Sequence, residues 1–155
     1  MRRVIAVGLA ALFVFSVATE AGLDSKKAKY VGGTVTAVKA ETEGTPSTDD
    51  EKVFVFTYKD GKLSIPYARV NDLEYGQKAG RRLGLALTIS PWLLLSKKRK
   101  HFLTIGYQDE NDKQQAVVFE LGKQIVRTTL ASIEARTGKK IDYQDDEARK
   151  SSKGN

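Results

Sequence analysis

The sequence of 155 residues contains no cysteine, only one histidine (His101) and three prolines. The lack of cysteine excludes a disulfide scaffold, cysteine-ligated zinc or iron–sulfur sites, and thiol catalysis. A single histidine excludes a metal site built from several histidines. The low proline content and the 41% of hydrophobic residues argue against a disordered chain. The length suits one domain that is held together by packing.

The N-terminus has the pattern of a secretory signal peptide, residues 1–18. Arg2 and Arg3 precede an uncharged apolar stretch, residues 4–17, and small side chains predict cleavage after Ala18. The stretch is shorter than the roughly 20 residues that a spanning helix needs. We therefore expect a periplasmic or secreted protein, with an uncleaved N-terminal membrane anchor as the alternative. Cleavage lowers the net charge from +7 to +5, because it removes two arginines and no acid.

Alternating apolar residues and β-branched residues predict antiparallel strands through much of the mature chain. Residues 19–29 are polar and are interpreted as a linker, and residues 41–51 as a polar loop. The expected strands lie within residues 30–40, 52–58, 62–67, 69–75, 101–107 and 114–121.

Four local signals refine these strands. Asp60-Gly61 predicts one hairpin turn, and the polar residues 108–113 predict a second. The Gly32-Gly33 pair predicts a bulge or bend in the first strand. Pro66 has no N–H to donate, so it is expected at a sheet edge or at a strand end.

The hydrophobic period changes near the C-terminus. Apolar residues at helical spacing predict a helix within residues 123–137, and Gly138 suits its C-cap. Residues 142–155 are charged and polar and are expected to form a frayed tail. The whole order predicts an α+β or mainly β fold: an antiparallel barrel or sandwich capped by one C-terminal helix.

This order resembles the pleckstrin-homology-like (PH-like, GRAM-type) superfamily. The residues that carry the resemblance are the strand–turn–strand run Val53–Tyr67, the following Val70-Asn-Asp-Leu73, and the strands His101–Tyr107 and Val117–Leu121. The resemblance implies a PH-like domain over residues 30–141, a bent barrel closed at one end by the helix. Some members of that superfamily bind phosphoinositides and others bind proteins.

The most distinctive segment is apolar and is bracketed by basic residues. Residues 83–96 carry no charge and include six leucines and Trp92. Fourteen residues are too few to span a bilayer, and Pro91 interrupts them. Tryptophan favours the membrane interface, and cations at both ends suit anionic headgroups. The candidate contact residues are Arg81, Arg82, Trp92, Lys97, Lys98, Arg99 and Lys100.

Three roles remain open for residues 83–96: intramolecular core, membrane-surface contact, or an interface for another protein or a second copy. The first function we expect is a non-enzymatic binding or adaptor module of the cell envelope at an anionic membrane surface. The alternative is a protein-interaction or homo-oligomerising module. The basic run 97–100 also resembles a nucleic-acid patch, but export and the lack of interleaved aromatic residues argue against nucleic acid.

No motif in the sequence indicates an enzyme, a metal site or a cofactor. No Gly-x-Ser-x-Gly elbow accompanies His101, whose basic neighbours are expected to lower its pKa. The acidic residues within 109–120 have some of the spacing of an EF-hand calcium loop. Lys113, however, stands where a ligand is needed, and Gln114 stands where a glycine is needed. The acidic clusters at 49–51 and 145–147 are interpreted as solvated surface.

Overall fold

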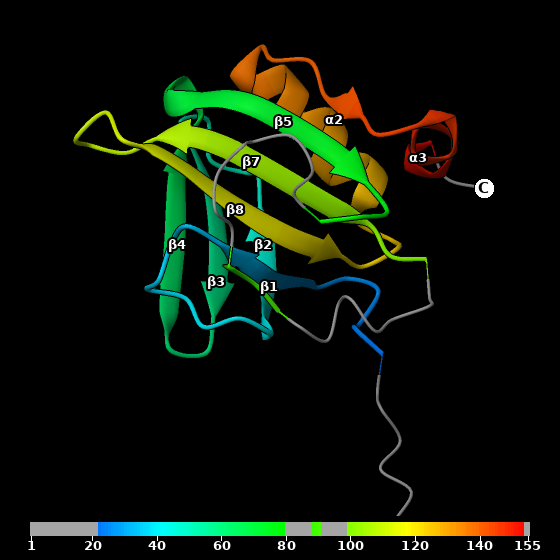
Figure 1. Cartoon of the computed structure of the whole chain (residues 1–155), viewed down its shortest axis with the longest axis horizontal. Coiled ribbons are helices and arrows are strands. Elements are labelled where there is room, and N and C mark those ends of the chain that lie inside the picture. Colours follow the sequence, from blue (N-terminus) through cyan, green and yellow to red (C-terminus); the bar gives the residue numbers. More distant parts are fainter. Residues whose placement is uncertain (1–21, 80–87, 91–98, 154–155) are drawn as a thin grey trace, which may run out of the picture.

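The structure is a computed structural model and describes residues 22–79, 88–90 and 99–153. Within these residues the chain forms one mostly antiparallel sheet of nine strands, followed by two α-helices (Figure 1). The strands are β1 (Ala28–Gly33), β2 (Thr42–Ser47), β3 (Val53–Tyr58), β4 (Gly61–Pro66), β5 (Val70–Gly76), β6 (Thr88–Ile89), β7 (Phe102–Gln108), β8 (Gln114–Leu121) and β9 (Asp142–Tyr143). The helices are α2 (Val126–Thr137) and α3 (Asp146–Ser152), and a 3-10 turn, η1 (Tyr67–Arg69), precedes β5. The predicted signal peptide lies outside the described residues.

The strand order in the sheet is β4-β3-β2-β1-β8-β7-β5-β9, and β6 pairs with β1 off this path. Both predicted hairpins are confirmed: Tyr58 pairs with Gly61 across the first turn, and Gln108 with Gln114 across the second. Pro66 is exposed at the end of β4, which is itself an end strand, so both predicted placements hold. Among the described strands, β5 and β9 alone pair in parallel.

The predicted closed barrel is wrong, because the sheet is open and its two end strands, β4 and β9, do not pair. The edge of β5 is occupied in part by β9, whose Asp142 and Tyr143 pair with Glu74 and Tyr75. At the other end, Pro66 in β4 lacks the N–H that a ladder needs. The sheet bends instead of closing, and in Figure 1 strands β3 and β4 run steeply across the direction of β5, β7 and β8. The predicted alternative, a sandwich, is wrong as well, because a sandwich has two sheets and the described strands form one.

The main core lies between one face of this sheet and α2. Aromatic side chains from three strands meet there: the Phe119 ring centroid lies 5.8 Å from that of Tyr30, 5.6 Å from Phe54 and 4.9 Å from Phe56. The predicted helix is confirmed over α2, which buries Val126, Leu130 and Ile133 against this core. Gly138 ends the helix in the left-handed conformation, with φ 67°, as expected of its C-cap.

The structure contains elements that the sequence did not predict. β2 occupies most of the predicted polar loop and pairs with β1 and β3. Its sequence, TEGTPS, has no apolar alternation, so the pattern did not predict a strand. The predicted frayed tail, where it is described, is ordered as β9 and α3. Asp145 caps α3 by accepting a hydrogen bond from the Ala148 N–H at 2.7 Å, and Ala148 is fully buried.

Candidate functional site

The apolar segment between the two basic clusters touches the described structure at its middle. Thr88 and Ile89 form β6, which pairs with Gly33 and Gly32 of β1, and the Ser90 N–H donates to the Val31 carbonyl at 3.0 Å. Ile89 is half-buried against a second, smaller hydrophobic cluster on the opposite face of the sheet from α2, made of Val31, Phe102 and Val118. Ile89 therefore belongs to the intramolecular packing.

Two of the seven predicted contact residues are described, and both have intramolecular partners. The Arg99 guanidinium pairs with the Glu147 carboxylate, and both side chains are exposed. The Lys100 Nζ lies 2.9 Å from Glu120 Oε2, with 24% of the lysine side chain and 10% of the glutamate side chain exposed. The other five lie outside the described residues: Arg81, Arg82, Trp92, Lys97 and Lys98.

The glycine pair in β1 makes the contact with β6 possible. Gly32 and Gly33 have φ values of 151° and 148°, a conformation that side chains rarely adopt. A Cβ on Gly32 would lie 2.1 Å from the Thr88 carbonyl oxygen, and one on Gly33 would lie 2.2 Å from the Ala116 carbonyl oxygen. The pairing register of β1 with β8 also shifts between Tyr30 and Gly32, which agrees with the predicted bulge or bend.

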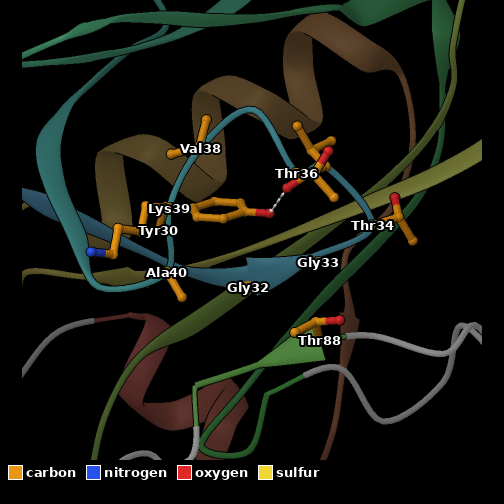
Figure 2. A pocket seen from close by; sticks show the side chains of 10 residues that line it. Tyr30, Gly32, Gly33, Thr34, Thr36, Val38, Lys39, Ala40 and Thr88 are labelled. Carbon is orange, nitrogen blue, oxygen red and sulfur yellow. Dashed lines mark hydrogen bonds between the residues drawn. The ribbon is translucent and has the colours of Figure 1, made fainter.

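A hollow of about 410 Å³ lies beside this glycine pair (Figure 2). Tyr30 extends along it and donates its hydroxyl to the Val35 carbonyl at 2.8 Å, and burial raises the pKa of Tyr30 to about 12. Threonine hydroxyls and the exposed Lys39 supply its other polar groups. The residues that line it are Tyr30, Gly32, Gly33, Thr34, Val35, Thr36, Val38, Lys39, Ala40 and Thr88. The sequence predicted no site here.

His101 lies directly before β7, in contact with Tyr75 of β5. Its Nδ1 is 2.6 Å from the Tyr75 hydroxyl oxygen, and the rings are stacked with their centroids 6.2 Å apart. The pKa of His101 is lowered, as predicted, but burial of the ring is the main cause and Lys123 adds to it, while Glu120 opposes it. Burial also raises the pKa of Tyr75.

The C-terminal segment Asp142–Ser152 contains β9 and α3 and is named the C-terminal clamp. It contacts one residue before the apolar segment, Lys78, and one after it, Arg99. Before that segment, Gln144 Nε2 donates to the Lys78 carbonyl at 2.6 Å, and the Lys78 N–H donates to Gln144 Oε1 at 3.1 Å. After it, Glu147 pairs with Arg99. Sequence reasoning missed these residues; Asp145 as an N-cap, with acids in the first turn of α3 and bases in its last, was the available signal.

The face of the sheet opposite α2 also carries buried acidic side chains. Glu74 and Glu120 are 1% and 8% exposed, and Gln144 Nε2 donates to Glu74 Oε1 at 2.5 Å. Lys100 neutralises Glu120. Among the residues that the structure describes, no group of three or more His, Cys, Asp or Glu side chains is placed to hold a metal ion. Of the helices in that part of the chain, none has both the length and the apolar character to cross a membrane.

Comparison of the chain with protein-family models and with curated proteins found no match. The resemblance to PH-like domains therefore stays a prediction, and the candidate site has to be argued from this chain's own residues. Those residues define one region: the apolar segment with its basic borders, the sheet face that pairs with its middle, and the C-terminal clamp, which contacts Lys78 before it and Arg99 after it.

Proposed function

We propose that the protein is a non-enzymatic binding or adaptor module of the cell envelope that associates with an anionic membrane surface through residues 81–100. One observation carries the proposal: fourteen uncharged residues with Trp92 are bracketed by Arg81 and Arg82 on one side and by the basic run 97–100 on the other. Tryptophan and flanking cations are the combination that suits the boundary between headgroups and acyl chains.

The fold supports this proposal by pairing the middle of the segment, β6, with β1. Gln144 of the C-terminal clamp contacts Lys78, which precedes the segment. The contacts for lipid in this proposal are the apolar residues 83–87 and 91–96, which lie outside the described residues. A PH-like arrangement of the bent sheet and α2 is part of the same proposal, as is delivery to the envelope by the N-terminal segment.

The basic residues are expected to contribute unequally. Each Lys or Arg near an anionic surface contributes about 1 kcal/mol. Lys100 is already paired with the largely buried Glu120, so we expect it to contribute least. Arg99 is exposed and its pair with Glu147 is exposed too, so this pair exchanges readily for a headgroup.

Co-sedimentation with vesicles tests the proposal. The mature protein should bind vesicles that contain phosphatidylglycerol, should bind pure phosphatidylcholine weakly, and should lose binding as salt rises. Lys97→Gln with Lys98→Gln should weaken binding to anionic vesicles about thirty-fold, as expected from about 1 kcal/mol for each charge. The matched control is Lys139→Gln with Lys140→Gln, which removes the same charge from exposed positions after α2.

Three results would count against the proposal. Equal weakening by both pairs of substitutions would show that only the net charge of the protein matters. Lipid-independent dimerisation that is lost in Trp92→Asp would instead support the alternative, a homo-oligomerising module that uses residues 83–96. Unfolding of Trp92→Asp would place the segment in the core and would remove the main support of both functions.

A further inference from the structure

We propose that one end of the sheet, formed by residues 24–27, 99–101 and 122–124, is a second contact surface for the anionic membrane and turns this end of the protein toward the headgroups. This surface is named the basic end. The inference rests on the proposed membrane association and adds three lysines that lie outside residues 81–100: Lys26, Lys27 and Lys123.

The chain before β1 is fastened to the turn that follows β8. The Gly122 N–H donates to the Lys27 carbonyl at 2.8 Å, and the Gln124 N–H donates to the Ser25 carbonyl at 3.0 Å. A Cβ on Gly122 would lie 2.5 Å from the Ser25 carbonyl oxygen, so the close approach of the two segments depends on glycine. This part of the expected linker is therefore held on the fold, and Lys26 and Lys27 with it.

The chain before β7 lies on the other side of the same turn. The strand order β1-β8-β7 places β8 in the middle, and the Leu121 N–H donates to the His101 carbonyl at 2.7 Å. Burial and then the charge of Lys123 lower the pKa of His101, so Lys123 lies near that ring. Figure 1 shows the starts of β1 and β7 and the end of β8 together, on the right of the view.

Three cations of the basic end are open to a partner. Lys26, Lys27 and Lys123 are exposed, and within the part of the chain that the structure describes none of them forms an ion pair. Backbone hydrogen bonds fix the segments that carry them, so a flat anionic surface meets all three together. Each cation near such a surface contributes about 1 kcal/mol.

The acids at this end reduce its positive charge without cancelling it. Glu120 pairs with Lys100, and Glu147 of α3 pairs with Arg99. Asp24 is exposed and accepts a hydrogen bond from the Lys26 N–H at 2.9 Å. The rest of α3 carries both signs, with acids in its first turn and bases in its last. The exposed lysines therefore remain as uncompensated positive charge.

The far end of the sheet has the opposite character. The turn between β7 and β8, at the left tip of the view in Figure 1, carries Asp109, Glu110 and Asp112. Its cations are Lys113 and Arg69, which pairs with Asp112 at 2.6 Å. Such an uneven charge distribution orients a protein above an anionic surface. The basic end faces the headgroups, and the turn between β7 and β8 points away from them.

Vesicle binding by two matched triple variants tests the inference. The test variant should bind vesicles of phosphatidylglycerol and phosphatidylcholine about ten-fold to a hundred-fold more weakly than the mature protein. It carries Lys26→Gln, Lys27→Gln and Lys123→Gln. The control removes the same charge from exposed positions in the β3–β4 hairpin and after α2, and should lose less than about three-fold. It carries Lys59→Gln, Lys62→Gln and Lys140→Gln. Equal weakening would overturn the inference.

The orientation is measured directly with single cysteines, because the chain has none of its own. A fluorophore on Gln124→Cys, at the basic end, should lose most of its emission to a quencher carried on the lipid headgroups. A fluorophore on Glu110→Cys, in the turn between β7 and β8, should lose little. Both positions are exposed, so neither substitution disturbs the core. This measurement also decides the question if the triple variant does not fold.

The two proposals fail in different ways. If the mature protein does not bind anionic vesicles at all, the proposed function is contradicted and this inference falls with it. If the protein binds vesicles but both fluorophores are quenched equally, or Glu110→Cys is quenched more, the membrane association stands and the basic end is overturned. The same holds if binding depends on Lys97 and Lys98 but is unchanged in the triple variant of the basic end.

Discussion

The Tyr75 hydroxyl oxygen lies 2.6 Å from Nδ1 of His101, and the two rings are nearly parallel, with 12° between their planes. Tyr75 is 1% exposed and belongs to the main core, while His101 directly follows the basic run. The contact therefore connects the core to one end of the candidate membrane-binding segment. Burial of the ring, which is the main cause of the lowered pKa of His101, therefore comes with a hydrogen bond to the core.

Tyr75→Phe should raise the pKa of His101, because the neutral Nδ1 loses its hydrogen-bond donor and the neutral form is no longer favoured. The same change should lower the free energy of unfolding at pH 7.5 by about 1 kcal/mol. The pKa is measured by NMR titration of the imidazole, and the stability by urea denaturation. A pKa that stays the same or falls would show that the hydrogen bond does not favour the neutral histidine.

Gly32→Ala should lower the free energy of unfolding by more than about 3 kcal/mol. The new Cβ would lie 2.1 Å from the Thr88 carbonyl oxygen, at a φ of 151°. Gly138→Ala is the matched control, because its φ is 67° but its Cβ would meet no other part of the fold within 4 Å, so only backbone strain of about 1 kcal/mol is expected. Equal losses in urea denaturation would mean that β6 does not pack against Gly32.

The two ion pairs of the basic run should differ in their contribution to stability. Glu120→Gln removes the partner of a largely buried Lys100 and should cost about 1–2 kcal/mol. Glu147→Gln breaks an exposed pair and should cost less than about 0.5 kcal/mol of global stability. Urea denaturation at one salt concentration measures both variants. A larger loss for Glu147→Gln would place the important contact in α3 instead.

Phe119→Ala should lower the free energy of unfolding by about 3–5 kcal/mol, because Phe119 is fully buried and contacts three other aromatic rings. Phe119→Leu keeps most of the volume and should cost clearly less. Thermal unfolding of the two variants measures the difference. Similar losses would mean that the aromatic contacts, and not the filled volume, decide the stability of this core.

The sequence predicted the strands whose side chains alternate or are β-branched. β3, β4, β7, β8 and α2 lie within or close to their expected bounds, because each carries an apolar pattern of period two or 3.6 that the core then buries. β2 and β9 have no such pattern, and they form because neighbouring strands offer hydrogen-bonding groups along their edges. Closure of the sheet was predicted wrongly, because nothing local in β4 or β9 specifies whether the two distant edges meet.

The sequence predicted the candidate site only through its composition, and none of its contacts. The apolar segment and its basic borders are visible in the sequence, but the contacts that hold its borders join residues far apart in the chain, such as Lys78 with Gln144 and Arg99 with Glu147. The lowered pKa of His101 was predicted in the right direction from its basic neighbours. Its main cause, burial, depends on packing that the sequence does not display.

Trp92 fluorescence, measured with and without phosphatidylglycerol vesicles, tests the proposed membrane association most directly. Trp92 is the only tryptophan, so the emission has one source. Membrane association predicts emission from a water-exposed indole in buffer and a shift to shorter wavelength only when anionic vesicles are added. An emission spectrum that is already at short wavelength in buffer and does not change with vesicles would place Trp92 inside the fold or an oligomer and would contradict membrane association.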